Sequence, residues 1–260
     1  MRDIVDEYPA GLRAAWESVD DDVWEEWGEE PPLPMLALTH GASDVDLARL
    51  QERYPSCPDT LLDLLRRVDG TYCRDYAGHE VNLLVLGSDV GGYPYHLLSV
   101  AQILESASDP LNAETIRQRY GDDLEECLPA GRESSWGEVA QVRRWPLVRW
   151  LPRSLRRRVQ QVVGLWRDLR TQGSPSFGNL DDRIDPDLPS SKWLHFSDCM
   201  NNGGTSQLYV DFDPLGEGRA GQIVRFLHDS DSYDVIADSF EEYLQQLIDT
   251  DYPFALPDNW

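Results

Sequence analysis

Residues 207–244 read QLYVDFDPLGEGRAGQIVRFLHDSDSYDVIADSFEEYL, and this stretch decides the fold class. Apolar and polar side chains alternate over 208–212, which is the period of a half-buried strand. A proline and three glycines then break the chain before a second strand at 222–228. A polar turn at 229–233 leads to a short edge strand at 234–237. The order of these segments predicts neighbouring strands joined by turns.

A helix is predicted directly after these strands. Ser239 and Glu242 match the S-x-x-E capping box that starts many helices. The apolar residues behind them recur at helical spacing, and they are Phe240, Tyr243, Leu244, Leu247 and Ile248. The stretch therefore predicts a β-β-β-α unit, and nothing in it indicates chemistry.

Three motifs in this stretch resemble the C-terminal signature of the SUKH superfamily. They are VDFDP at 210–214, GQI at 221–223 and VIADSFEEYL at 235–244. The N-terminal half resembles the same superfamily through WEEW at 24–27, the prolines of 31–34, Gly41-Ala42-Ser43 and Asp69-Gly70. Together these segments cover roughly half to two-thirds of the chain, and about 105–190 does not align. The superfamily contains fungal cell-wall synthesis regulators and many bacterial immunity proteins. The resemblance therefore implies an immunity protein that neutralises a cognate toxin without catalysis, or alternatively a regulatory scaffold related to cell-wall synthesis control.

The predicted fold class is α+β, with a largely antiparallel, twisted sheet flanked by helices and carrying a helical insertion. Residues 1–34 are predicted as an N-terminal helical arm, with a helix at about 10–27. Residues 35–260 form the SUKH-like domain, with the insertion at about 105–190. Within it, 152–171 has the apolar stripe of an amphipathic helix surrounded by arginines.

Three shorter segments complete the prediction. Ser43 is placed to cap a helix that buries Leu47 and Leu50. The apolar run at 81–86 predicts one strand, and the glycine-rich sequence at 91–95 predicts a turn that exposes its tyrosines.

The chain is strongly acidic, with 47 acidic and 23 basic residues and a net charge of −24. Such a surface repels phosphate backbones, which excludes ordinary nucleic-acid binding, and it attracts basic proteins. The charge is uneven, because 132–170 holds ten arginines against three acids. That block either folds back on the protein's own acidic surface or anchors a separate acidic partner.

Membrane and redox features point to the cytoplasm. The sequence contains no run of about 18 apolar residues, the length needed to span a membrane, and the N-terminus lacks the apolar core of a signal peptide. Four scattered cysteines without a C-x-x-C pair are typical of reduced thiols. We therefore expect a cytoplasmic protein without a membrane partner.

Several motifs could carry chemistry, but a structural explanation accounts for each of them better. The G-x-G-x-x-G match at 216–221 precedes a strand, whereas a dinucleotide site needs a helix there. Asp211 and Asp213 could hold a hard cation, but acids at a strand end before proline more often form a turn. The five histidines lack metal-ligand spacing, and no G-x-S-x-G motif marks a serine nucleophile. We predict no catalytic centre, no metal and no cofactor.

The predicted function directs attention to acidic turns and loop tyrosines. A basic toxin or effector protein would meet carboxylates that guide the encounter and tyrosines that supply buried area. The predicted partner-binding residues are Asp211, Asp213, Asp229, Asp231, Asp234, Tyr93 and Tyr95.

Overall fold

The computed structural model describes residues 4–20, 23–24, 32–90, 94–121, 178–201, 204–228 and 231–255. Its α-helices are α1 (Ile4–Glu17), α3 (Pro32–Leu36), α4 (Asp44–Arg53), α5 (Asp59–Leu65), α6 (Val100–Ser106), α7 (Ile116–Tyr120) and α12 (Phe240–Asp249). Its strands are β1 (Arg74–Tyr76), β2 (His79–Val81), β3 (Leu84–Leu86), β4 (Tyr95–Leu97), β5 (Leu194–Asn201), β6 (Gly204–Asp211), β7 (Gln222–Leu227) and β8 (Ser232–Ala237). Short 3-10 helices are η1 (Pro110–Ala113), η2 (Ser190–Lys192) and η4 (Pro253–Ala255).

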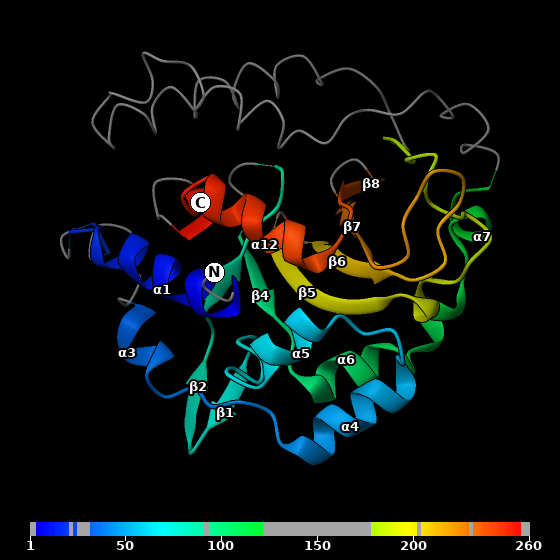
Figure 1. Ribbon diagram of the computed structural model, residues 1–260. Coiled ribbons are helices and arrows are strands. Elements are labelled where there is room, and N and C mark those ends of the chain that lie inside the picture. Colours follow the sequence, from blue (N-terminus) through cyan, green and yellow to red (C-terminus); the bar gives the residue numbers. More distant parts are fainter. Residues whose placement is uncertain are drawn as a thin grey trace, which may run out of the picture.

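The main sheet has six strands in the order β3-β4-β5-β6-β7-β8, and every neighbouring pair is antiparallel. Strands β1 and β2 form a separate hairpin, which projects from the body (Figure 1). Beyond β8, Leu180 pairs in parallel with Tyr233, so the chain at 179–181 runs along that edge of the sheet. The predicted α+β class with an antiparallel sheet is confirmed.

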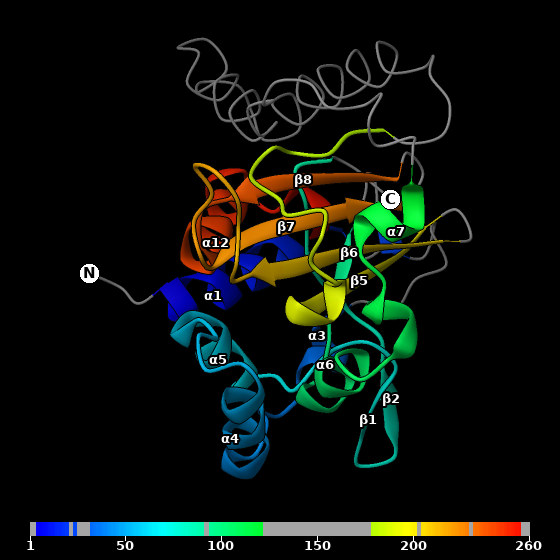
Figure 2. The ribbon, with the colours of Figure 1, turned by 90° about the vertical axis from the view of Figure 1, so that its right-hand side faces the viewer.

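Both faces of this sheet are buried, by different elements. Figures 1 and 2 show α1 and α12 on one face and α7 on the other. The first face contributes Leu208, Val210 and Ile223 to a core shared with these helices. The second contributes an aromatic cluster with Trp193, Tyr209, Val224, Phe226, Tyr233 and Val235, packed with Ile116 of α7. Because β6 is covered on both sides, Tyr209 and Asp211 are buried as well, and the predicted half-exposed strand is wrong in this respect.

The N-terminal helix contributes to the first core. Helix α1 begins at Ile4 and ends at Glu17, so the prediction of a helix at about 10–27 placed its start six residues late. The Tyr8 hydroxyl donates to the Val85 carbonyl, and the Tyr252 hydroxyl donates to the Tyr8 carbonyl at 3.0 Å. These contacts join both chain ends to the sheet. The domain boundary at residue 34 stays a prediction.

Helix starts follow the predicted caps. The Asp46 N–H donates to Ser43 Oγ at 3.2 Å, and the Glu242 N–H donates to Ser239 Oγ at 3.1 Å. Glu242 Oε2 accepts from the Asp238 N–H at 2.9 Å, one residue before the partner in a full capping box.

Two predictions between residues 81 and 95 are wrong. The run at 81–86 is divided between β2, which pairs with β1, and β3, which pairs with β4. Leu83 lies between them, where its N–H donates to the Thr71 carbonyl at 2.8 Å. Tyr95 lies in β4 with no exposed surface, instead of in an exposed turn.

Most of the predicted insertion at about 105–190, including the helix at 152–171 and its arginines, lies outside the described residues. Its described ends contain η1, α7 and η2. Arg117 of α7 forms an ion pair with Asp187 at 2.6 Å, which links the two ends of this segment.

Candidate functional site

The structure divides the predicted contact residues between opposite ends of the sheet. Asp211 and Asp213 lie where β6 ends, and Asp231 and Asp234 lie at the turn between β7 and β8. Five residue steps along β7 separate these ends, which corresponds to roughly 17 Å of extended chain. Asp229 and Tyr93 lie outside the described residues. The predicted residues therefore do not form one contiguous patch.

Asp211 is fully buried, so its prediction as a surface contact is wrong. Its Oδ2 accepts from Gln222 Nε2 at 2.9 Å, and its Oδ1 accepts from the Asp213 N–H at 3.0 Å. Burial raises the pKa of this carboxyl above 3.8, although both hydrogen bonds oppose the shift. Asp213 is exposed in the turn. The pair thus forms the predicted turn, and the described residues contain no cluster of three or more metal-ligating side chains.

Asp234 is held inside an ion-pair network, which leaves it little freedom to meet a partner. Arg225 of β7 is buried and contacts both Asp89 and Asp234. Asn179 Nδ2 also donates to Asp234 Oδ1 at 2.6 Å. Tyr95 is buried as well. Among the predicted contact residues that the structure describes, Asp213 and Asp231 therefore remain: both have accessible surface, and neither belongs to such a network.

A row of polar side chains crosses the second face of the sheet, at a place that the sequence did not indicate. His96 of β4 lies directly opposite Asp198 of β5, and Asp198 lies opposite Gln207 of β6. Gln207 Nε2 donates to Asp198 Oδ1 at 3.3 Å. The Tyr209 hydroxyl donates to Gln207 Oε1 and extends the row toward the aromatic cluster.

A second chain of hydrogen bonds reaches the same carboxylate from α6. His195 Nε2 lies 2.9 Å from Asp198 Oδ1, and His195 Nδ1 lies 2.8 Å from Ser106 Oγ. Asn112 Nδ2 donates to the same hydroxyl at 3.2 Å. A carboxylate can only accept, so His195 Nε2 donates to Asp198.

Ser106, His195 and Asp198 have the order of a nucleophile, a base and an orienting acid. Acyl transfer also needs donors aimed at the developing oxyanion. Ser106 is the last residue of α6, where the helix carbonyls give a negative partial charge that disfavours an alkoxide. The geometry therefore favours a role in positioning Asp198 over nucleophilic catalysis.

Tyr72 lies next to this row, and its ring contacts the His96 ring with centroids 4.9 Å apart. His96 Nδ1 lies 2.9 Å from the Leu83 carbonyl, which makes it a donor. Burial lowers the pKa of His96 below 6.5, so this imidazole is neutral at pH 7. Burial raises the pKa of the Tyr72 phenol above 10, and the charges of Cys73 and Asp198 add to the shift.

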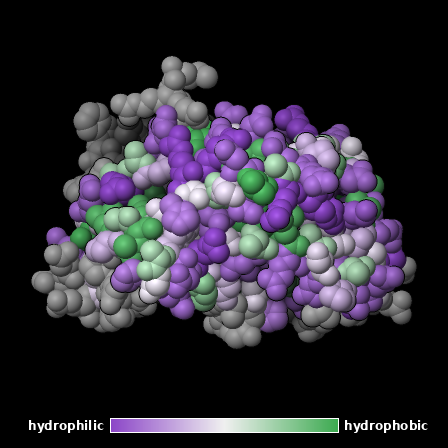
Figure 3. Space-filling view, turned by 90° about the horizontal axis from the view of Figure 1, so that it is seen from below, coloured by the Kyte–Doolittle hydropathy of each residue, from purple (hydrophilic) through white to green (hydrophobic). Residues whose placement is uncertain are grey.

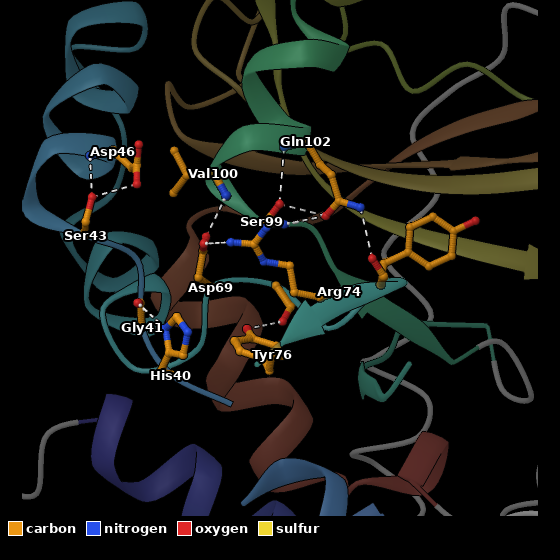
Figure 4. A network of polar contacts seen from close by, with 12 residues as sticks. His40, Gly41, Ser43, Asp46, Asp69, Arg74, Tyr76, Ser99, Val100 and Gln102 are labelled. Carbon is orange, nitrogen blue, oxygen red and sulfur yellow. Dashed lines mark hydrogen bonds and ion pairs between the residues drawn. The ribbon is translucent and has the colours of Figure 1, made fainter. Parts of the chain in front are cut away.

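The backbone that carries Tyr72 is fixed by the network in Figure 4. Asp69 accepts from the Val100 N–H at the start of α6 at 2.9 Å and from Arg74 Nη2 at 2.6 Å. Gln102, which completes the capping box of Ser99, donates from Nε2 to the Tyr72 carbonyl at 3.0 Å. The Asp69-Gly70 motif thus positions the segment that presents Tyr72.

Little in the sequence indicates this site. His96, His195 and Asp198 have ordinary spacing, and Ser106 and Gln207 belong to no motif. Only the strand pairing brings positions 96, 198 and 207 together. The Asp69-Gly70 motif, which the sequence does single out, lies next to the site.

The fold and the site together define an α+β domain built on one antiparallel meander. A family model described as SMI1 / KNR4 family (SUKH-1) matches residues 41–246. The chain belongs to this family, whose members are generally non-enzymatic immunity or regulatory proteins. Comparison with curated proteins gave no match. Among the described residues, no helix has the length and apolar character needed to cross a bilayer.

Proposed function

We propose that this protein binds a cognate, basic toxin or effector domain in the cytoplasm and neutralises it by direct contact, without catalysis. Family membership supports an immunity protein and a regulator equally. The observation that favours an immunity protein is that most arginines of the described residues are already paired with carboxylates of the same chain.

Nine of the eleven arginines in the described residues already form ion pairs with carboxylates of the same chain. Ten of the 23 basic and seven of the 47 acidic side chains lie within 122–177, so the rest of the chain carries 13 basic and 40 acidic residues. Its uncompensated charge is therefore negative. Viewed from the side of α4 and the β1–β2 hairpin, the surface is mostly hydrophilic (Figure 3).

Such a surface suits a cationic partner. Long-range attraction raises the rate of encounter, and like-charge repulsion rejects acidic competitors. Among the predicted residues, exposed Asp213 and partly exposed Asp231 keep this role in the proposal, together with Asp229 and Tyr93. A regulatory scaffold remains the alternative, because it too would act through protein contacts.

The test is co-expression of the full chain with the protein encoded next to it, followed by co-purification and calorimetric titration. We expect a complex with submicromolar affinity that forms with a basic toxin domain and abolishes that domain's activity. A neighbouring product that does not bind at micromolar concentration would contradict the immunity proposal and favour the scaffold.

A further inference from the structure

We infer that Asp198 and Tyr72 form a subsite that receives a guanidinium group, namely an arginine side chain of the protein partner. The inference rests on the proposed function, because it assigns a contact to that binding reaction. It concerns the second face of the sheet.

The Asp198 carboxylate is prepared to accept an additional donor. Its hydrogen bonds from His195 and Gln207 both end on Oδ1. Within the described part of the chain, no donor contacts Oδ2, and the side chain is 14% exposed. The two bonds fix the orientation of the carboxylate, so a ligand would lose little free energy in ordering it. The open oxygen can therefore form a charge-assisted hydrogen bond.

The aromatic surface beside the carboxylate favours arginine over lysine. Tyr72 is partly exposed, and its ring rests on the buried imidazole of His96. A guanidinium is planar, stacks on aromatic rings and donates in a fixed fork, whereas an ammonium is a strongly hydrated point charge. An arginine could thus stack on Tyr72 while it donates to Asp198.

The charge of the subsite is also suitable. His96, which faces Asp198 across the strand pair, is neutral at pH 7 and does not offset the carboxylate. Arg74, the arginine nearest to Tyr72 along the chain, has its Nη2 directed to Asp69. Neither group therefore places an unpaired positive charge beside Asp198.

The first experiment uses N-acetyl-arginine methylamide as the probe and follows the NMR signals of the full chain. We expect saturable shifts at Tyr72, His96 and His195, with millimolar affinity, and none with the uncharged citrulline analogue. Asp198→Asn should abolish these shifts, and so should Tyr72→Ala, which leaves the carboxylate network in place. Equal shifts in both variants, or shifts with citrulline, would overturn the inference.

The second experiment measures binding of the cognate toxin domain to the same variants. Loss of one charge-assisted contact should weaken binding by about 10- to 100-fold, mainly through faster dissociation. Asp44→Asn, which removes an exposed carboxylate at the start of α4 that belongs to no predicted contact, is the matched control. If the toxin binds but Asp198→Asn has no effect, the subsite is wrong and the proposed function stands. If arginine amide binds but no toxin does, the proposed function fails and the subsite stands.

Discussion

At the scale of a single residue, Asp211 illustrates what a linear pattern conceals. The alternation over 208–212 placed it on a solvent-facing side, but the second face of the sheet is covered as well. Its carboxylate accepts from Gln222, which lies opposite on β7. The sequence therefore predicted the turn correctly and the exposure of the side chain wrongly, because exposure depends on segments far along the chain.

The buried carboxyl makes a testable contribution to pH-dependent stability. Its pKa is higher in the folded protein than the 3.8 of a free side chain, so the folded state binds more protons between these two values. This contribution is fully present below the unfolded pKa and is lost as pH rises through the folded pKa. We expect Asp211→Asn to remove this contribution. The unfolding free energy of the wild type, relative to that of the variant, should therefore fall as pH rises from about 4.

Urea unfolding at a series of pH values would measure this difference. Asp44→Asn serves as the control, because it removes an exposed carboxylate at the start of α4 and keeps the same change in charge. Parallel pH profiles for wild type and Asp211→Asn would show that the raised pKa does not act on folding.

At the scale of elements, local signals predicted the structure well where local chemistry decides it. The helix cap at Ser239 and the strands β6 to β8 follow from turn residues and periodicity within short windows. The division of 81–86 between two sheets depends on pairing with β1 and β4, which no window of that run contains. The polar row has the same origin, since three separate strands supply His96, Asp198 and Gln207.

Gly70 tests how tightly the segment leading to Tyr72 packs on α6. Its φ of +85° suits glycine, and an added Cβ would lie 2.5 Å from the Ser99 backbone nitrogen. Gly78 has nearly the same φ, +88°, but nothing lies within 4 Å of its Cβ position. Alanine at either site should lower the free energy of unfolding by about 1–2 kcal/mol through backbone strain. Gly70→Ala should cost about 1–3 kcal/mol more, because backbone atoms of α6 must move.

Chemical denaturation of the two variants would measure these costs. Because the backbone strain is matched, the difference between them reports the contact with Ser99. Equal destabilisation would mean that the start of α6 moves freely and does not hold the Asp69–Tyr72 segment in place.

At the scale of the whole molecule, charge acts through its sum more than through any single pair. Exposed ion pairs such as Arg49–Asp46 contribute only about 0–1 kcal/mol each to stability. The net charge of −24 instead acts at long range on whatever approaches. This property could be derived from composition alone, whereas the proposed contact at Asp198 could be inferred only from the fold.

Total charge predicts how association with a basic toxin depends on salt. The association rate constant should fall steeply as ionic strength rises from 10 mM to 500 mM, because the Debye length shrinks from about 30 Å to only a few ångströms. The dissociation rate constant should change little, because it depends mainly on short-range contacts. Stopped-flow mixing with the cognate toxin domain measures both.

A charge variant separates steering from contact. Glu52 and Glu80 are exposed on α4 and β2, and neither element belongs to the six-stranded sheet that carries Asp198. Changing both to lysine alters the net charge by four and should slow association at low salt while leaving dissociation unchanged. Glu52→Gln with Glu80→Gln should give about half of that effect on the logarithm of the rate, since it removes half as much charge. A faster dissociation in either variant would instead place these residues inside the interface, and salt-independent association would show that the acidity of this protein does not guide its partner.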